Sequence, residues 1–272
     1  MPYIYPDNYI VLCHGFLGTD GMMGINYFRG VKADLESQGC KVVVPKVSMT
    51  GSIDERAGQL NSQINDLLGL RPGASTSRPD VHLIGHSMGG LDARRLVHMP
   101  DLRYNVLSIT TISTPHYGSP IASLSDSLGV LSRLQCKILL GLLSGSGKAM
   151  NDMTPQNMAH FNASYKDVAG IKYYSVTSKF DPRINHLFFI SNKHIKNQSD
   201  PRYPEAFGEN DGMVSVGSAK WGEYLGLEGD TSHIGVVGWG ITGITAGDSN
   251  YDTEDMYRRL VHNVARKVEG KA

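Results

Sequence analysis

The stretch Val-His-Leu-Ile-Gly-His-Ser-Met-Gly-Gly, residues 81–90, places a serine between two glycines, directly after an apolar run and before a segment of helical pattern. In the pattern Gly-x-Ser-x-Gly, a sharp turn between a strand and a helix lifts the serine hydroxyl above the sheet. Side chains on either flank would clash there, and Gly85 and Gly89 avoid the clash. The stretch predicts a nucleophilic Ser87, with the backbone N–H of Met88 directed toward an oxyanion. Taken alone, it also fits a glycine-rich turn with a capping serine.

Three further segments fit the same chemistry. In Cys13–Gly18, a His-Gly turn follows an early apolar run and predicts the backbone N–H of Phe16 as the second oxyanion donor. The other two segments, Glu209–Ser215 and Asp230–His233, supply an acid and a histidine. The chain order serine, aspartate, histidine is that of the α/β-hydrolases. We therefore predict a nucleophile, an acid and a base in the side chains of Ser87, Asp211 and His233.

Two other aspartates compete for the role of the acid. Asp181 follows a predicted strand directly, but it precedes a proline, and Asp-Pro more often begins a turn. Asp230 lies only three residues before His233, so it could orient that ring only through a tight turn. Asp211 is the better candidate.

Strand and helix signals alternate along the chain, which predicts a mostly parallel sheet with helices on both faces. At 272 residues, the chain fits one such α/β domain spanning residues 1–272. We expect strands at residues 9–12, 41–44, 81–86, 106–112 and 172–177, and helices at residues 28–38, 53–70 and 88–98.

Between Ser119 and Asn162 the alternation stops, and leucine and isoleucine recur at helical spacing from Leu124 to Leu143. One reading is ordinary core helices. The other is an amphipathic lid over the serine, favoured by the position of this insertion after the nucleophile. Apolar residues in these loops are candidates for acyl-chain contacts, although local packing explains them equally well: Leu17, Met22, Met23 and Leu124.

Composition excludes several classes of protein. The 26 basic and 26 acidic residues balance, so nothing indicates nucleic-acid binding. No apolar run approaches the ~20 residues needed to span a bilayer. The start, Met1–Pro6, lacks the pattern of a secretory signal, so we expect a chain made without one or a mature form. Three cysteines indicate no disulfide framework, and without zinc-binding spacing we expect neither metal nor other cofactor.

Several motifs together resemble the bacterial triacylglycerol lipases of Pseudomonas, Burkholderia and Proteus. Besides the serine turn and the His-Gly turn, the similar segments are Tyr27–Val31, Ser113–Ser119, Met153–Pro155 and Asn210–Ser215. The resemblance implies the α/β-hydrolase fold, a helical lid at about residues 119–162, and the triad and oxyanion donors named above. It further implies hydrolysis of triacylglycerol during transient contact with a lipid interface.

Two positions depart from that family. Two residues after His233 the family usually carries a calcium-binding aspartate, where this chain has Gly235, so we expect that calcium site to be missing. A disulfide cysteine often follows the Asn-Asp-Gly turn, where this chain has Val216 and Gly217. Two alternatives to a lipase stay open: a carboxylesterase acting on soluble short-chain esters, and a non-catalytic relative that binds an apolar ligand.

Overall fold

Six parallel strands form the central sheet, in the order β2-β1-β3-β4-β5-β6. The computed structural model describes residues 2–16, 27–73, 77–122, 147–184, 186–239 and 251–272. The strands are β1 (Tyr9–Cys13), β2 (Lys41–Val43), β3 (Asp80–His86), β4 (Asn105–Ile112), β5 (Lys172–Lys179) and β6 (Glu223–Asp230). The parallel sheet predicted from the alternating pattern is confirmed.

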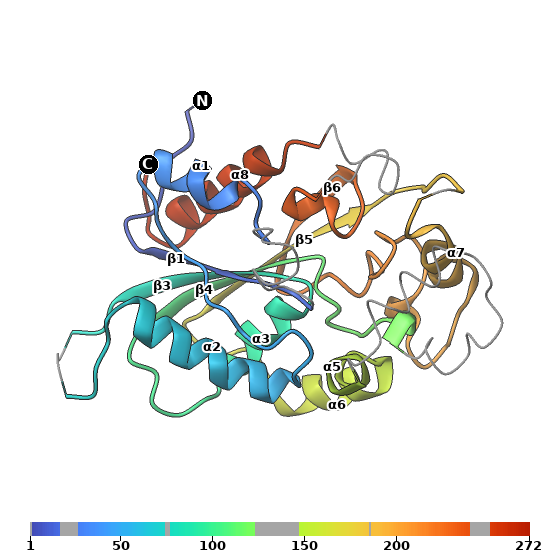
Figure 1. Ribbon diagram of the computed structural model, residues 1–272, viewed down its shortest axis with the longest axis horizontal. Helices are drawn as coiled ribbons and strands as arrows, with labels where there is room; N and C mark the ends of the chain where they lie inside the picture. Colours follow the sequence, from blue (N-terminus) through green and yellow to red (C-terminus); the bar gives the residue numbers. More distant parts are fainter. Residues whose placement is uncertain (1, 17–26, 74–76, 123–146, 185, 240–250) are drawn as a thin grey trace.

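Helices cover both faces of this sheet (Figure 1). On one face lie α1 (Val31–Ser37) and α8 (Thr253–Lys267), which contact each other. On the opposite face lie α2 (Ile53–Leu67) and α3 (Met88–Leu96), also in mutual contact. Further helices in the described residues are α5 (Gly147–Asp152), α6 (Pro155–Ser164) and α7 (Phe189–Asn197), and 3-10 turns lie at Pro204–Ala206 and Gly235–Val237. This layered arrangement is that of an α/β-hydrolase.

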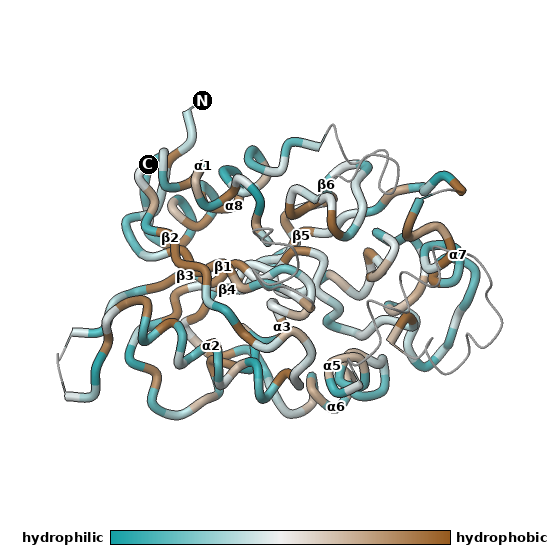
Figure 2. The backbone as a smooth tube through the Cα atoms, in the orientation of Figure 1, coloured by the Kyte–Doolittle hydropathy of each residue, from teal (hydrophilic) through white to brown (hydrophobic). Residues whose placement is uncertain are grey.

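The alternation of side chains along β1 explains why both layers are stable. Ile10 and Leu12 belong to the core beneath α1 and α8, whereas Val11 and Cys13 belong to the core beneath α2 and α3. All four are buried, as expected for a central parallel strand covered on both sides. Figure 2 shows the strands as a band of hydrophobic residues between more polar outer segments.

Local signals set the ends of the helices. Ser52 caps α2, because its hydroxyl accepts from the N–H of Glu55 while the Glu55 carboxylate accepts from the N–H of Ser52. The helix ends at Leu67, earlier than the expected residue 70, because Gly69 adopts a φ of 68°. Thr154 caps α6 and Pro155 takes its first position, so the Met153–Pro155 motif serves as a helix start.

Residues 123–146, which hold most of the predicted lid, lie outside the described residues. Its described flanks comprise α5, α6 and a short turn that contains Ile121. None of the helices in the described ranges combines the length and apolar character needed to cross a membrane.

Candidate active site

Ser87 lies on a strained turn between β3 and α3, with φ 54° and ψ −130°. A Cβ on Gly85 would lie 2.6 Å from the backbone of Gly90, and a Cβ on Gly89 would lie 2.2 Å from the carbonyl oxygen of Cys13. The turn is held from both sides, because Ser87 N–H donates to Ile112 and the Thr114 hydroxyl donates to the Ser87 carbonyl. The two glycines therefore allow the strand, the serine and the helix to pack this closely.

A continuous chain of hydrogen bonds joins Ser87, His233 and Asp211. His233 Nε2 lies 2.9 Å from Ser87 Oγ, and His233 Nδ1 lies 2.8 Å from Asp211 Oδ2. All three side chains are buried. The backbone joins the same loops, because the N–H of His233 donates to the carbonyl oxygen of Asp211 at 2.9 Å. The structure thus brings together three residues separated by 124 and 22 positions in the sequence.

The Asp211 carboxylate accepts four hydrogen bonds. Oδ1 accepts from the backbone N–H groups of Met213 and Val214, at 3.0 and 2.8 Å. Oδ2 accepts from His233 and from the hydroxyl of Ser178, the latter at 3.2 Å. Because a carboxylate only accepts, the Nδ1 of His233 carries the proton, which leaves the Nε2 lone pair facing the Ser87 hydroxyl. This arrangement is suited to abstracting a proton from a serine.

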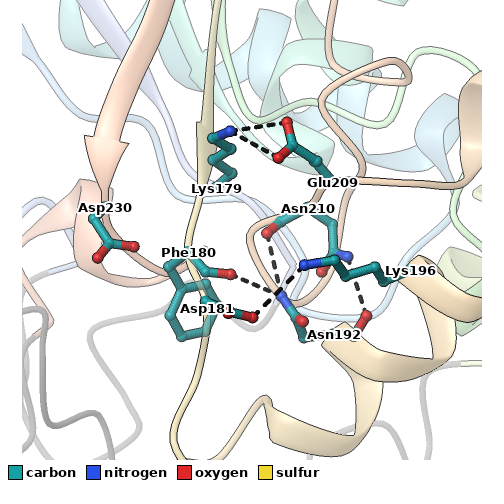
Figure 3. Close-up of a pocket in the computed structure, with 8 residues that line it drawn as sticks. All are labelled: Lys179, Phe180, Asp181, Asn192, Lys196, Glu209, Asn210 and Asp230. Atoms are coloured by element: carbon teal, nitrogen blue, oxygen red, sulfur yellow. Dashed lines mark hydrogen bonds and ion pairs between the residues drawn. The ribbon is translucent and has the colours of Figure 1, made fainter.

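The two competing aspartates occupy a separate polar pocket of about 190 Å³ (Figure 3). Asp181 is largely exposed and lies 3.6 and 3.8 Å from the ammonium groups of Lys193 and Lys196. Asp230 also lines this pocket, at the end of β6, together with Lys179 and Glu209, which pair with each other. Among these three acids, Asp211 is the one that pairs with His233, at 2.8 Å.

The predicted oxyanion turn packs directly against the serine turn. A Cβ on Gly15 would lie 2.8 Å from the Cβ of Ser87 and 3.0 Å from the carbonyl oxygen of His86, so Phe16 follows a point of contact between the two loops. Met88 is the first residue of α3, where backbone N–H groups lack partners within the helix. This placement suits both residues as donors to an oxyanion beside Ser87.

His14 and Arg56 hold the backbone of the predicted oxyanion turn. His14 Nε2 accepts from the N–H of Val47 at 3.1 Å, and its Nδ1 lies 2.9 Å from the Gly15 carbonyl oxygen. Arg56 donates to the carbonyl oxygens of His14 and Gly15 and, through two nitrogens, to the carboxylate of Asp92. Burial raises the pKa of that carboxyl, against the lowering effect of Arg56. A fully buried ion pair therefore supports the loop that precedes Phe16.

A second imidazole stands beside the His233 ring. The His86 ring lies 4.7 Å from that of His233, centre to centre, and the Tyr27 hydroxyl lies 2.6 Å from His86 Nδ1. Complete burial lowers the pKa of His86 well below its ordinary value, and burial raises the pKa of Tyr27. His86 is therefore neutral, and its Nδ1 shares a hydrogen bond with the Tyr27 hydroxyl. It adds no positive charge next to His233.

Comparisons with known proteins identify the family of this chain. The profile of the PGAP1-like alpha/beta domain matches residues 46–198. Triacylglycerol lipase 2 of Saccharomyces cerevisiae is 35% identical over 224 residues, which cover 80% of this chain and 64% of the yeast protein. A triacylglycerol lipase of Vibrio cholerae is 31% identical over 274 residues, which cover 86% of this chain and 80% of that lipase. The chain belongs to the triacylglycerol lipase family and carries a PGAP1-like alpha/beta domain.

A solved structure shows that this lipase family member shares its fold with other lipases. The mature form of a Bacillus licheniformis lipase aligns with a TM-score of 0.69 at 18% identity, over 96% of both chains. The predicted α/β-hydrolase fold, the resemblance to triacylglycerol lipases and the enzyme class, a serine ester hydrolase, are confirmed.

An apolar cluster surrounds the site of this lipase family member. Phe16 lies in the predicted oxyanion turn, and three other residues lie within two positions of a residue of the hydrogen-bonded chain: Met88 beside Ser87, Met213 near Asp211 and Ile234 beside His233. All four join this cluster. The cluster extends to residues of the described lid flanks and of α7: Ile121, Ala149, Met150, Met153, Met158, Leu187, Phe188 and Ile195. Met213 and Ile234 did not stand out in the sequence, although each lies within two positions of a triad residue.

The predicted acyl-contact residues Leu17, Met22, Met23 and Leu124 lie outside the described residues. Within the described ranges, no group of three or more histidine, cysteine, aspartate or glutamate side chains has the arrangement of a metal site. Cys13 and Cys40 are free thiols, and both are buried.

Proposed function

We propose that this chain hydrolyses triacylglycerol by forming an acyl-enzyme on Ser87, with His233 as the base and Asp211 as the acid that orients it. The observation that supports this most directly is the hydrogen-bonded sequence from Asp211 through His233 to Ser87, with distances of 2.8 and 2.9 Å. Kinship with triacylglycerol lipases of yeast and Vibrio cholerae supports an ester of that class as substrate.

In the proposed mechanism, His233 Nε2 takes the proton of Ser87 Oγ as the oxygen attacks the ester carbonyl. The imidazolium that forms keeps its Nδ1 proton in a hydrogen bond to Asp211 Oδ2, and it then gives its Nε2 proton to the departing alcohol. Water repeats the sequence on the acyl-enzyme and releases the fatty acid. The backbone N–H groups of Phe16 and Met88 stabilise the oxyanion of each tetrahedral intermediate, an effect worth about 3 kcal/mol per donor in a comparable serine hydrolase.

The apolar cluster supports an acyl chain as the group that this site accommodates. Phe16, Met213 and Ile234 are only partly buried, and they join the cluster from three different loops around Ser87. A partly buried apolar wall beside the nucleophile favours a hydrocarbon chain, because such surface gains free energy when it leaves water. The substrate class that fits both the apolar wall and the triad is an ester of a fatty acid.

We further propose that the chain is a single domain over residues 1–272, with a lid inserted at about residues 119–162. The described flanks of that insertion support this placement, because Ile121, Ala149 and Met150 join the same apolar cluster as Met88. A lid that moves at a lipid surface would expose this cluster to the interface and admit an acyl chain.

The decisive experiment compares a soluble short-chain ester with an emulsified long-chain triacylglycerol, across the solubility limit of each. Ser87→Ala should abolish both activities. Ser191→Ala is the matched control, because Ser191 is also buried and its hydroxyl donates to the Phe188 carbonyl oxygen, away from the triad. Activity that rises above the solubility limit supports the lidded lipase. Saturating activity confined to soluble esters would make the chain a carboxylesterase, and no activity would favour a ligand-binding relative.

A further inference from the structure

Two serines outside the triad connect the Asp211 carboxylate to the central sheet. Ser178 lies on β5 and Ser113 follows β4 directly, so both stand where adjacent parallel strands end. Ser113 Oγ lies 2.9 Å from Ser178 Oγ, and Ser178 Oγ lies 3.2 Å from Asp211 Oδ2. The two serines and the aspartate are each at most 2% exposed.

The direction of these hydrogen bonds follows from counting protons. Each hydroxyl has one hydrogen to donate, and the Ser178 hydroxyl donates its own to the carboxylate. The hydrogen between the two serines must therefore come from Ser113. The result is a directed relay, Ser113 to Ser178 to Asp211, in which each bond polarises the next.

Both serines lie at irregularities of the backbone. Ser113 has a φ of 48°, which a residue with a Cβ rarely adopts, while its N–H donates to the carbonyl oxygen of Val176. At Ser178 the register between β5 and β6 shifts, and such an irregularity re-aims a side chain. The strand ends are thus shaped in a way that brings the two hydroxyls into line with the carboxylate.

Ser178 differs from the other donors to Asp211 in where it comes from. Met213 and Val214 belong to the loop of Asp211 itself and move with it. Ser178 belongs to the sheet that also carries Ser87 at the end of β3. Its hydroxyl therefore fixes Oδ2, the oxygen that faces His233, relative to the nucleophile.

We propose that Ser178, held by Ser113, is a positioning residue of the active site that fixes Asp211 Oδ2 against His233 during ester hydrolysis. This role rests on the proposed function of Ser87, Asp211 and His233. Ser178 reaches no reacting atom, so its effect passes entirely through the carboxylate. The hydrogen bond from Ser178 matters most when the imidazolium forms, because the Asp211 carboxylate then pairs with a positively charged ring and its position decides the strength of that ion pair.

The test compares Ser178→Ala with Ser175→Ala. Ser175 lies on the same strand, is fully buried, and its hydroxyl accepts from the N–H of Trp221. We expect Ser178→Ala to lower kcat by about tenfold, the size of one charge-assisted hydrogen bond, with KM for a soluble ester changed by less than about twofold. Equal kcat in the two variants would overturn the proposal.

Ser113→Gly is a second variant, which tests the relay even if the fold does not tolerate Ser178→Ala. Glycine adopts the observed φ of 48° without strain, so this change removes the first hydroxyl of the relay and relaxes the backbone. We expect kcat to fall in the same direction as in Ser178→Ala, by a smaller factor. Unchanged kcat in a folded Ser113→Gly protein would contradict the relay.

A spectroscopic readout separates this proposal from the proposed function. The proton between His233 Nδ1 and Asp211 Oδ2 gives a low-field NMR resonance that requires no substrate. We expect this resonance to move in Ser178→Ala and to stay in place in Ser175→Ala. Absent ester turnover in the unmodified chain would contradict the proposed function; a moved resonance would still support the positioning role, and an unmoved one would overturn it.

Discussion

The guanidinium of Arg56 donates a hydrogen bond of 2.8 Å to the carbonyl oxygen of His14. The same guanidinium donates at 2.7 and 2.9 Å to Asp92, and both side chains are at most 1% exposed. Burying two charges costs more than their attraction returns unless further hydrogen bonds satisfy them. Here the extra acceptors are backbone carbonyls of the oxyanion turn. The ion pair therefore fixes the loop that carries Phe16.

Arg56→Met should lower the free energy of unfolding by about 3 to 5 kcal/mol, because it leaves Asp92 as an unpaired buried carboxyl. Adding Asp92→Asn should recover part of that loss, since the unpaired charge is then gone. Activity should stay low in both variants, because the carbonyls of the oxyanion turn remain without their donor. Urea unfolding and kcat on a soluble ester measure the two effects.

The control for this cycle is Arg95→Met. Arg95 pairs with Asp54, whose side chain is 67% exposed, and such surface pairs contribute about 0 to 1 kcal/mol. If the double variant regained full kcat together with stability, the guanidinium would support only the fold and the assigned role in the oxyanion turn would be wrong.

Asp211→Asn should reduce kcat by a factor on the order of 10⁴, the loss seen when the equivalent acid of a serine protease is replaced by its amide. An amide in place of Oδ2 would present a donor to His233 and favour the wrong tautomer. Asp181→Asn is the control, because that side chain is exposed and faces two lysines. Retained turnover in Asp211→Asn with lost turnover in Asp181→Asn would transfer the role to Asp181.

Sequence patterns predicted the strands β1 to β5, because each is an apolar run with turn residues on both sides. They did not predict β6, since Tyr-Leu-Gly-Leu-Glu-Gly carries two glycines and little apolar alternation. They also gave no helix for residues 253–267, although Met256, Leu260 and Val264 recur at helical spacing and pack on the core of the sheet. The helical spacing of these three residues would have been sufficient to predict the helix from the sequence.

The residues of the candidate site also differ in whether the sequence alone reveals them. Ser87 could be predicted, because the steric demands of its turn leave a local mark in Gly85 and Gly89. Ser178 could not, because a serine at the end of a strand has no pattern that reveals a carboxylate 33 positions away. Arg56 left a fainter sign: it is a charged residue on the buried face of α2, one position before Ala57.

Gly89→Ala should prevent native packing of the serine turn. The added Cβ would lie 2.2 Å from the Cys13 carbonyl oxygen, and two backbone segments cannot separate there without moving β1 from α3. Gly229→Ala is the control, because a Cβ there meets no atom within 4 Å. We expect soluble, active protein only from the control. Wild-type activity in Gly89→Ala would show that the contact between β1 and the serine turn is not required.

Stability should fall as the pH drops below about 6.5, because two fully buried histidines stay neutral in the fold. Burial lowers the pKa of His86 and of His116 well below the ordinary value, so the unfolded chain binds more protons than the folded one in this range. The stability they contribute is present above the unfolded pKa and is lost toward acid pH, with a slope of up to about 1.4 kcal/mol per pH unit for each histidine. Urea unfolding between pH 7.5 and 5.0 measures the slope.

His116→Gln should make this slope shallower by the share of one histidine. His116 accepts from Arg94 at Nδ1 and donates through Nε2 to the Thr111 hydroxyl, so both ring nitrogens are satisfied only in the neutral form. A glutamine amide preserves one donor and one acceptor without titrating. His160→Gln is the matched control, because His160 is exposed on α6 and should leave the slope unchanged. Equal slopes in the two variants would mean that His116 does not couple folding to pH.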